Sequence, residues 1–552
     1  MKISWDYETD YLIAGTGVAG LSAAITASRY GLTTLVVEST DKWGGTTAIS
    51  GGGLWLPNNP LMARAGIADT LDDALHYMEQ TIGNVGPWTS HERKLAFLEA
   101  ISPYVEMLAD EGVRWAMARD YPDYYAELPG GVIGRSLEVK PFNVRKLGKW
   151  RKKMRKIAPV PLMIDDMWLL TRGWSTPSGF IRSVIFVFRT VTNLLLGKVK
   201  YGLGGALAGS LMHIVLRRAI PIWLNSPLTE LIIDQGRVVG AIVEKEGRSV
   251  RIRSRRGVML AAGGFARDTH WRQQYHGIQG WSSAPDGDLG QGIQAGEKVG
   301  GSLGMMDDAW WGAAAASHDG SAQYGFILHE RSYPWSIIVD QAGNRYLNES
   351  EPYTDLGHHL LEHHKKTPAI PSWLVTDRRH TISFLNSRLI VPGAKRKLVK
   401  MGELVRAATL DELADKMGVD CETLNATVER FNGFAREGVD RDFHRGRTAH
   451  DRYYSNPMVK PHPNLGTIEK PPFRALKIYP GDLGTKGGLI TDAHARVLRK
   501  DESIIGGLYA AGNNTASVMG HTYPGPGSTI SPAAIFGFLG AFHAAHEQTT
   551  EV

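Results

Sequence analysis

An α/β fold organised around a parallel sheet is predicted from three observations. Residues 10–14 and 33–38 read as buried strands, and residues 18–30 between them have helical spacing, which makes one βαβ unit of about 30 residues. A Gly-x-Gly-x-x-Gly run joins the first strand to the helix. Near the opposite end of the chain, residues 506–511 read as one more strand. The sheet is therefore expected to take strands from both ends of the chain.

The turn after the first strand has the spacing of a phosphate-binding loop. Gly15 allows the tight turn, Gly17 lets a pyrophosphate approach the helix N-terminus, and Gly20 permits close packing of helix on strand. Glu38 ends the second strand 23 positions after Gly15, where its carboxylate can accept hydrogen bonds from ribose hydroxyls. A glycine turn that merely packs does not explain Glu38, so a Rossmann-like dinucleotide-binding domain is predicted.

The loop after the second strand separates the two candidate dinucleotides. Residues 41–53, DKWGGTTAISGGG, offer many backbone donors to the phosphates and ring of a flavin. The segments 257–265 and 506–514 add small residues at strand ends. FAD is therefore predicted as the cofactor rather than NAD(P), and no metal site is predicted. The predicted FAD contacts are Gly15, Gly17, Ala19, Gly20, Glu38, Ser39, Gly45, Thr46, Thr47, Ser50, Gly52, Ala262, Gly263, Gly512, Asn513 and Ile530.

The order of the remaining elements predicts two domains. The FAD-binding domain is expected from residues 1–305 and 476–552, and an inserted α+β catalytic domain from 306–475, where the alternation of strand and helix is lost. A basic and apolar excursion at about 146–200 interrupts the first domain. The other expected elements are helices at 70–85, 91–112, 204–219 and 531–546, strands at 220–225 and 257–265, a hairpin at 228–244, and loops at 44–60 and 120–145.

Five further segments carry distinctive motifs. They are YPDYYAELPGG (121–131), MDDAWWG (306–312), NESEPY (348–353), PGDLGTKGG (480–488) and GHTYPGPG (520–527). With the glycine segments, they resemble the bacterial 3-ketosteroid Δ1-dehydrogenases, within the flavoprotein superfamily that includes fumarate reductase. The likeness runs from about residue 6 to about residue 546. It implies oxidation of ring A of a 3-ketosteroid at carbons 1 and 2, with FAD taking the hydride and an external, quinone-like electron acceptor.

The TYPGPG turn carries the chemistry of a carbonyl-binding site. Its prolines restrict the backbone and its glycines admit a ligand, so the Tyr523 O–H and the Gly527 N–H can donate to one ketone oxygen as an oxyanion hole. The resemblance places the family's carbonyl-binding roles on these two residues. It also places the base that removes the carbon 2 proton on Tyr353, assisted by Tyr124. A phenol titrates near pH 10, so Tyr353 needs a neighbour that stabilises its anion. Side chains around MDDAWWG are expected to line an apolar substrate pocket.

Some assignments stay open at this stage. Tyr121 and Tyr125 are near enough to be confused with Tyr124, and Gln291 stands where the wider superfamily often has an Asp. The activity could instead be 4,5-desaturation of a 3-ketosteroid by an enzyme of the same superfamily. A fumarate-reductase-like activity would need convergent Arg and His residues, which the TYPGPG turn does not offer. A flavoprotein scaffold without turnover is the alternative from another class.

The positive charge of the chain is concentrated in one segment. Residues 145–156, RKLGKWRKKMRK, carry eight basic side chains, and without them the net charge of +6 would become −2. Basic and bulky apolar residues then interleave as far as residue 200, as in helices that lie on an anionic membrane. A solvated loop beside a packed helix is the plainer interpretation, and nucleic acid is not expected as a partner. The expected partners are a 3-ketosteroid, the electron acceptor and a peripheral membrane contact through 145–200.

The N-terminus has no apolar signal core, and no uncharged apolar run of about 18 residues is found. Residues 201–216 are the longest candidate, with four glycines and a His. The sequence therefore predicts a cytoplasmic protein, at most peripheral on the inner face of the membrane. The single cysteine, Cys421, and the HxxEH run of His359, Glu362 and His363 are both interpreted as ordinary surface features rather than as a nucleophile and a zinc site.

Overall fold

The computed structural model describes residues 3–155, 160–317, 324–383 and 393–547. Within them, an eight-stranded sheet has the order β21-β22-β11-β1-β2-β8, and β10 and β9 extend it from β11. The pairs among β22, β11, β1, β2 and β8 are parallel. The prediction of a parallel sheet drawn from both chain ends is therefore confirmed. The strands are β1 (Tyr7–Ala14), β2 (Thr34–Val37), β8 (Ile222–Trp223), β9 (Leu228–Asp234), β10 (Arg237–Lys245), β11 (Arg248–Leu260), β21 (Arg496–Leu498) and β22 (Ile504–Ala510).

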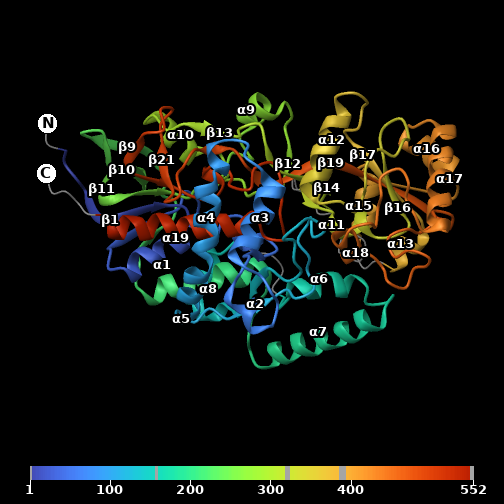
Figure 1. Cartoon of the computed structure of the whole chain (residues 1–552), viewed down its shortest axis with the longest axis horizontal. Coiled ribbons are helices and arrows are strands. Elements are labelled where there is room, and N and C mark those ends of the chain that lie inside the picture. Colours follow the sequence, from blue (N-terminus) through green and yellow to red (C-terminus); the bar gives the residue numbers. More distant parts are fainter. Residues whose placement is uncertain (1–2, 156–159, 318–323, 384–392, 548–552) are drawn as a thin grey trace.

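Both faces of this sheet are buried. Successive side chains of a strand point to opposite faces, and in β1 Tyr11 and Ile13 join one hydrophobic core while Leu12 and Ala14 join another. Helices α1 (Val18–Arg29), α8 (Leu203–Arg217) and α19 (Ile530–His546) contribute to the first core. Figure 1 shows α1 and α19 lying together although they come from opposite ends of the chain. This arrangement brings the two glycine-rich segments to the same edge of the sheet.

A second sheet holds the middle of the chain. In the described residues its order is β15-β14-β19-β17-β16, with β12 and β18 also paired to β19. The predicted domain boundary at 475/476 falls inside β19, a strand of this sheet whose last residues are the GDLGT motif. Helix α12 (Tyr353–His364) begins at the NESEPY motif. The strands are β12 (Trp281–Ser282), β14 (Ala309–Ala316), β15 (Tyr324–Phe326), β16 (Ser336–Val339), β17 (Ser372–Thr376), β18 (Leu404–Ala407) and β19 (Phe473–Thr485).

Two local expectations differ from the structure. The helix expected at 91–112 is two helices, α4 (His91–Glu99) and α5 (Ile101–Asp110). The segment 120–145, expected to be a loop, contains β5 (Ser136–Val139), which pairs with β3 (Leu54–Trp55) and β4 (Trp115–Met117). All four residues of β5 are buried, including Glu138, so its side chains show no alternation that would mark a strand.

The basic and apolar excursion folds into a pair of helices at the edge of the molecule. It consists of the 3₁₀ segment η3 (Val144–Lys153), α6 (Ile164–Thr171), α7 (Pro177–Leu195) and β7 (Lys200–Tyr201); Lys156, the last residue of the basic run, lies outside the described residues. Figure 1 shows α7 along the outer edge of the fold. Its basic residues Arg182 and Arg189 both turn inward to the buried Asp166, at 2.6 and 2.7 Å.

This arrangement corrects the sequence-based choice of apolar helix. Residues 201–216, the longest candidate, largely form α8, and α8 is buried in the core. Helix α7 is, in the described part of the chain, the one helix long and apolar enough to cross a membrane by length and composition, and only 11% of its apolar window is buried. The sequence pattern missed it because Arg182 and Arg189 interrupt the apolar run.

Candidate active site

A single cavity gathers most of the predicted functional residues. It opens where β1, β2, β11 and β22 end and extends toward α12 and the TYPGPG turn. Four predicted catalytic residues line it: Tyr124, Tyr353, Tyr523 and Gly527. All the predicted FAD contacts except Gly20 line it as well, namely Gly15, Gly17, Ala19, Glu38, Ser39, Gly45, Thr46, Thr47, Ser50, Gly52, Ala262, Gly263, Gly512, Asn513 and Ile530.

Backbone geometry shapes the glycine-rich half of the cavity. Gly15 has φ +113°, and a Cβ there would lie 2.2 Å from the Ala261 carbonyl oxygen, so a side chain is excluded on both counts. A Cβ at Gly20 would lie 2.0 Å from the Gly15 carbonyl oxygen. Gly20 therefore lets α1 pack directly against the turn. It does not line the cavity, so it is a packing residue and not the cofactor contact that was predicted.

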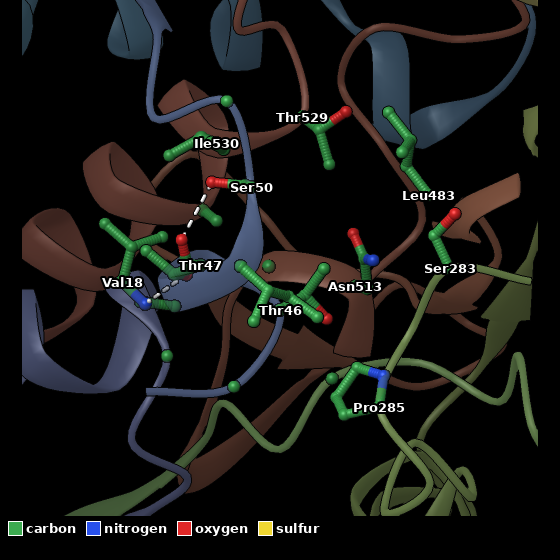
Figure 2. Close-up of a pocket in the computed structure, with 18 of the residues that line it drawn as sticks. Val18, Thr46, Thr47, Ser50, Ser283, Pro285, Leu483, Asn513, Thr529 and Ile530 are labelled. Carbon is green, nitrogen blue, oxygen red and sulfur yellow. Dashed lines mark hydrogen bonds between the residues drawn. The ribbon is translucent and has the colours of Figure 1, made fainter. Parts of the chain in front are cut away.

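Hydrogen bonds fix the polar side chains in this half of the cavity. Thr16 donates to one carboxylate oxygen of Glu38 through its backbone N–H and its hydroxyl, at 3.3 and 2.5 Å. The Thr40 hydroxyl donates to the other oxygen at 3.0 Å. Figure 2 shows Thr47 beside Val18, whose N–H donates to the Thr47 hydroxyl at 3.0 Å. The N-terminal residues of α1 and α19 both line the cavity, and helix N-termini favour anions.

The other half of the cavity is a cluster of buried phenols. The ring centroids of Tyr124 and Tyr353 lie 5.6 Å apart, those of Tyr353 and Tyr523 lie 4.5 Å apart, and those of Tyr124 and Tyr523 lie 5.2 Å apart. The Gly527 backbone is close enough to the Tyr523 phenol to lower its pKa, although burial, the larger effect, raises it. Gly527 has φ +108°, and a Cβ there would lie 2.5 Å from the Gly53 carbonyl oxygen. Only glycine fits this position.

Several cavity residues carry no signal in the sequence. The Tyr121 phenol contacts the Tyr454 phenol and lies 3.4 Å from that of Tyr124, although 333 positions separate Tyr121 from Tyr454. Helix α6 brings Met167 and Trp168 to the cavity from the excursion, which was not expected to contribute to the site. Tyr125 does not line the cavity and donates to Asp355 at 2.8 Å instead, which distinguishes it from Tyr124. The residues not predicted that complete this half are Ile164, Phe326, Leu328, His329, Tyr453 and Leu483.

The MDDAWWG segment lies behind the cavity instead of lining it, which corrects the expectation of an apolar wall there. Asp308 lies 2.8 Å from His358 Nε2 on α12 and 2.9 Å from His521 Nδ1 in the TYPGPG segment. It also pairs with the buried Lys486 at 3.6 Å, and Lys486 donates to the Thr522 carbonyl at 3.2 Å. Burial alone would raise the pKa of Asp308, but Lys486 and the two histidines hold it well below its usual range. Asp308 thus connects the helix that begins with Tyr353 to the turn that carries Tyr523.

Comparison with known proteins identifies the family. Residues 10–530 match the family described as FAD binding domain. The chain is 42% identical to the 3-oxosteroid 1-dehydrogenase of Mycobacterium tuberculosis (strain ATCC 25618 / H37Rv), over 98% of this chain and 99% of that relative. The chain belongs to the 3-oxosteroid 1-dehydrogenase family of FAD-binding proteins. It is therefore a flavin oxidoreductase, as the sequence predicted.

Two more relatives show the range of the family. The crystal structure of 3-ketosteroid Δ1-dehydrogenase from Sterolibacterium denitrificans, in complex with 1,4-androstadiene-3,17-dione, superposes with a TM-score of 0.93 at 35% identity and covers 98% of this chain and 100% of that chain. The 4-oxocyclohexanecarboxylate 2-dehydrogenase of Sinomonas cyclohexanicum is 33% identical, over 96% of this chain and 92% of that relative.

The residues of the glycine-rich half fit FAD. Glu38 lines this half with a carboxylate that suits a ribose, and the two helix N-termini there offer donors that suit a pyrophosphate. Asp288, three positions before Gln291, also lines the cavity, and its Oδ2 is buried with no hydrogen-bond partner among the described residues. Burial raises the pKa of this carboxyl to about 6. A hydroxyl of the bound cofactor would satisfy the orphaned oxygen.

The phenols do not become basic through contact with one another. Burial, followed by the neighbouring Tyr523 and Tyr124, raises the pKa of Tyr353 well above 10. Burial raises the pKa of Tyr124 well above 10 too. Any role as a base therefore requires a further group that favours the phenolate.

The HxxEH run and the cysteine have ordinary partners. His359 Nδ1 lies 2.9 Å from Glu351, and His363 Nε2 lies 2.9 Å from Asp340. In the parts of the chain that the structure describes, no group of three or more His, Cys, Asp or Glu side chains is arranged to hold a metal ion. Cys421 donates to Asp411 at 3.1 Å, and this contact raises the pKa of the thiol.

Proposed function

We propose that this enzyme introduces the 1,2 double bond into ring A of a 3-ketosteroid. The observation that carries the proposal is the convergence of Tyr523, Gly527, Tyr353 and Tyr124 at one end of the cavity whose other end fits FAD. In this proposal residues 1–305 and 476–552 hold FAD, while 306–475 contributes Phe326, Leu328 and Tyr353 to the steroid site. A flat, apolar ligand suits aromatic walls.

The chemistry follows from the positions of the donors. The Tyr523 O–H and the Gly527 N–H donate to the carbon 3 oxygen and stabilise the negative charge that develops there. This polarisation acidifies the carbon 2 proton, which passes to the Tyr353 phenolate as the C–H bond breaks. Tyr124 orients Tyr353 through the contact of their rings. FAD, when bound, supplies the acceptor for the hydride of carbon 1, and a quinone-like acceptor reoxidises it.

A small carboxylated ketone is a poorer fit. The curated relative that acts on 4-oxocyclohexanecarboxylate raises this alternative. Among the described residues that line the cavity, the one Lys or Arg is Arg155, which donates to Thr40 at 2.9 Å on the Glu38 side. The phenol end therefore offers no cation to a carboxylate, and the same argument weighs against a fumarate-like dicarboxylate.

Anaerobic reduction of the purified yellow protein tests the proposal. A panel of 3-ketosteroids, with 4-oxocyclohexanecarboxylate and fumarate-type substrates beside them, is added and the flavin absorbance is followed. Bleaching by the steroids alone is expected. A spectrum that no 3-ketosteroid changes would favour a scaffold without turnover. With a 5α-saturated steroid, a product desaturated only at carbons 4 and 5 would replace 1,2-desaturation with the rival activity.

We also propose that residues 145–200 hold the enzyme on the inner face of an anionic membrane. Helix α7 exposes a continuous apolar surface, with Phe188 74% and Leu195 83% exposed, because its two arginines turn inward to Asp166. The basic η3 segment adjoins it, and Arg145 lies beside Gly197 just after α7. Helix α6, which packs on α7, lines the cavity. An apolar surface and the substrate site therefore share one pair of helices.

Liposome sedimentation tests this contact. Salt-sensitive binding to vesicles with anionic lipid, weak binding to neutral vesicles, and loss of binding in Phe188→Glu are expected. Met458→Glu, at a residue 60% exposed elsewhere, is the matched control and should bind like the wild type. Equal behaviour of the two variants, or no binding at any salt concentration, would return the segment to a solvated loop beside a surface helix.

A further inference from the structure

A row of aromatic side chains forms one wall of the cavity. The ring centroids of Tyr523 and Tyr124 lie 5.2 Å apart, and those of Tyr124 and Tyr121 lie 6.3 Å apart. Tyr121 stacks on Tyr453 with a centroid distance of 4.4 Å, and the Tyr453 ring lies 5.2 Å from that of Trp168. All five side chains line the cavity. The row therefore runs from the TYPGPG turn to helix α6.

The far end of this row holds two polar atoms without partners. The Trp168 Nε1 and the Tyr453 hydroxyl are both buried, and neither forms a hydrogen bond with the described residues. A buried donor that stays unpaired is costly, so such a group calls for a partner. Orphaned polar atoms also occur at Trp88 and Tyr11, which do not line the cavity. Trp168 and Tyr453 differ from these because their rings are in contact and both line the cavity.

A buried arginine braces the two side chains. Arg172 caps the C-terminal end of α6, and its guanidinium carbon lies 3.9 Å from the centroid of the Trp168 ring. The same guanidinium donates to the Tyr453 carbonyl at 2.9 Å. Arg172 thus joins the end of α6 to the end of α18 (Ala449–Tyr453). The indole and the phenol are therefore held in place before a ligand binds, which lowers the entropic cost of binding.

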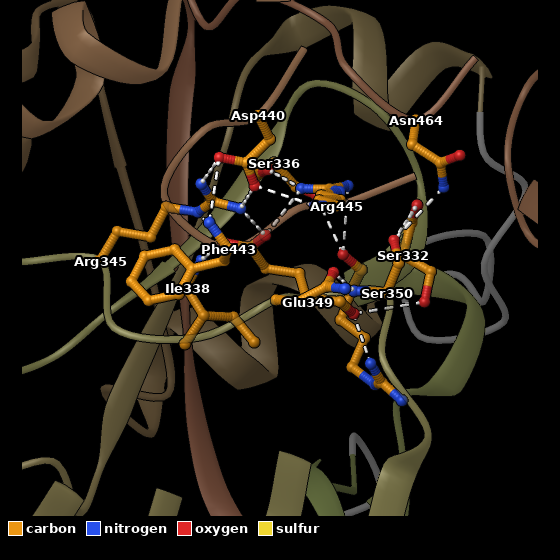
Figure 3. A network of polar contacts seen from close by, with 12 residues as sticks. Ser332, Ser336, Ile338, Arg345, Glu349, Ser350, Asp440, Phe443, Arg445 and Asn464 are labelled. Atoms are coloured by element: carbon orange, nitrogen blue, oxygen red, sulfur yellow. Dashed lines mark hydrogen bonds and ion pairs between the residues drawn. The ribbon is translucent and has the colours of Figure 1, made fainter. Parts of the chain in front are cut away.

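Helix α18 is also tied to the segment that leads into Tyr353. Asn464 donates to the Asp451 carbonyl on α18 at 2.7 Å and to the Ser350 hydroxyl at 3.3 Å. Figure 3 shows Asn464 and Ser350 beside the buried ion pairs that Glu349 forms with two arginines. The far end of the row is therefore fixed in place relative to the proposed base.

The surroundings of the pair favour an uncharged oxygen as the partner. No Lys or Arg side chain among the described residues lines this half of the cavity, and Arg172 lies behind the Trp168 ring, outside the wall. His329 lines the cavity too, and burial lowers its pKa to about 4, so it is neutral. A ketone or hydroxyl oxygen can accept from an indole N–H and a phenol O–H, whereas a carboxylate would lack a counter-charge. The apolar side chains in this half are Ile164, Met167, Phe326 and Leu328.

We propose that Trp168 and Tyr453 form a second oxygen-binding site, which selects 3-ketosteroids that carry a ketone or hydroxyl oxygen on ring D. This inference rests on the proposed function. A steroid whose carbon 3 oxygen is held by Tyr523 and Gly527 lies flat along the aromatic row, and its ring D end reaches the pair. The Trp168 N–H and the Tyr453 O–H donate to the oxygen there. A hydrocarbon at that end leaves both donors unpaired, and a site built to pair with a polar group discriminates against a ligand that lacks it.

A matched pair of steroids tests the site. 4-Androstene-3,17-dione has a ketone at carbon 17, whereas 4-androsten-3-one has a methylene there and is otherwise identical. The concentration dependence of anaerobic flavin reduction gives an apparent dissociation constant and a limiting rate for each steroid. The wild-type holoenzyme should bind the diketone about tenfold more tightly or better. The limiting rates of the two steroids should be similar, because the lost contact is remote from the reacting carbons.

Trp168→Phe and Tyr453→Phe each keep the ring and remove the polar atom. Each variant should lose most of the preference for the diketone, while its apparent dissociation constant for 4-androsten-3-one stays within a few-fold of wild type. Equal weakening for both steroids would mean that the polar atoms matter only for packing, and this result would overturn the proposal. An unchanged preference in both variants would overturn it as well.

Trp88→Phe and Tyr11→Phe are the matched controls. Each also removes a buried polar atom that has no partner among the described residues, but at a position outside the cavity wall. Both controls should keep the wild-type preference for the diketone. If either control lost the preference as fully as the site variants, loss of any orphaned donor would explain the result and the site would be rejected.

The wild-type measurement separates this inference from the proposed function. If both steroids reduce the flavin with equal apparent affinity, no oxygen is recognised at ring D and the inference is overturned, while the proposed function stands. If neither steroid reduces the flavin, the proposed function itself is refuted, and this site with it. If Trp168→Phe does not retain flavin, Tyr453→Phe decides alone, because Tyr453 lies on a different helix.

Discussion

The two halves of the cavity are built in different ways. The FAD half is made by backbone from a few continuous segments, in which Gly15, Gly17 and the strand ends leave room for the cofactor and Glu38 stands ready for a ribose. The phenol half is made by side chains that arrive separately from distant parts of the chain, with Tyr121 and Tyr454 in contact across 333 positions. Damage to the first half should therefore release FAD, whereas damage to the second should slow turnover while FAD remains bound.

Tyr353→Phe should have the largest effect on turnover. Removing the phenol oxygen removes the proposed base, and general-base catalysis typically contributes about 10² to 10⁴ in rate, so flavin reduction by a 3-ketosteroid should slow by about 1,000-fold. The variant should keep its yellow colour and wild-type flavin content, because Tyr353 lies in the phenol half. Stopped-flow reduction under anaerobic conditions gives the rate. A rate within a few-fold of wild type would remove Tyr353 from the role of base.

Tyr523→Phe should slow flavin reduction by about 100-fold or more, since one oxyanion donor is lost and the Gly527 N–H remains. Tyr125→Phe is its control: Tyr125 is a neighbour in the fold that donates to Asp355 and does not line the cavity. We expect its rate to stay within a few-fold of wild type. If Tyr125→Phe were as slow as Tyr523→Phe, loss of any nearby phenol would explain the effect and the oxyanion role would fail.

The same contrast decides how much the sequence could predict. The FAD half was predictable because Gly15 to Glu38 is one βαβ unit, in which local spacing determines the turn, the helix and the strand end. In the phenol half, the TYPGPG turn itself indicated Tyr523 and Gly527, whereas the roles of Tyr124 and Tyr353 came only from the family resemblance. Tyr454 and Trp168 carry no local signal, because only the packing of α6 and the second sheet brings them to the cavity.

The errors have a common physical cause. Strand β5 was missed because its polar residues Ser136 and Glu138 are buried. Helix α7 was not singled out as the long apolar helix because Arg182 and Arg189, which interrupt its apolar run, pair with Asp166 inside the fold. In each case a tertiary contact changed the environment that composition suggests. Asp308 was overlooked for the same reason, since its partners His358 and His521 lie 50 and 213 positions away in the sequence.

Gly15→Ala should show the opposite signature from the tyrosine variants. A Cβ at Gly15 would meet the Ala261 carbonyl at 2.2 Å in a backbone conformation, φ +113°, that alanine rarely adopts. The variant should be purified with most of its FAD missing, about tenfold less than wild type, as measured by the ratio of flavin to protein absorbance. Gly31→Ala is the control, because Gly31 also has a positive φ, +86°, but no atom within 4 Å of the added Cβ. Equal FAD loss in both variants would trace the effect to backbone strain alone.

Asp308→Asn should have the smallest effect on turnover, because Asp308 holds α12 and the TYPGPG turn in register without facing the substrate. Loosening His358 and His521 should misplace Tyr353 relative to Tyr523 and slow flavin reduction by about tenfold, with FAD retained. Asp340→Asn removes a similar contact, to His363 on the same helix, and should leave the rate near wild type.

A pH signature separates this positioning role from a general loss of packing. The pKa of Asp308 is held well below its usual range in the fold, so its contribution to stability is present above the unfolded value of about 4 and is lost as pH falls below it. Chemical denaturation of holoenzyme between pH 7 and about 3 should show a smaller acid-induced loss of stability in Asp308→Asn than in wild type. Identical pH dependence in the two proteins would mean that the carboxyl with the lowered pKa does not hold the turn and the helix together, and other contacts would have to fix Tyr353 relative to Tyr523.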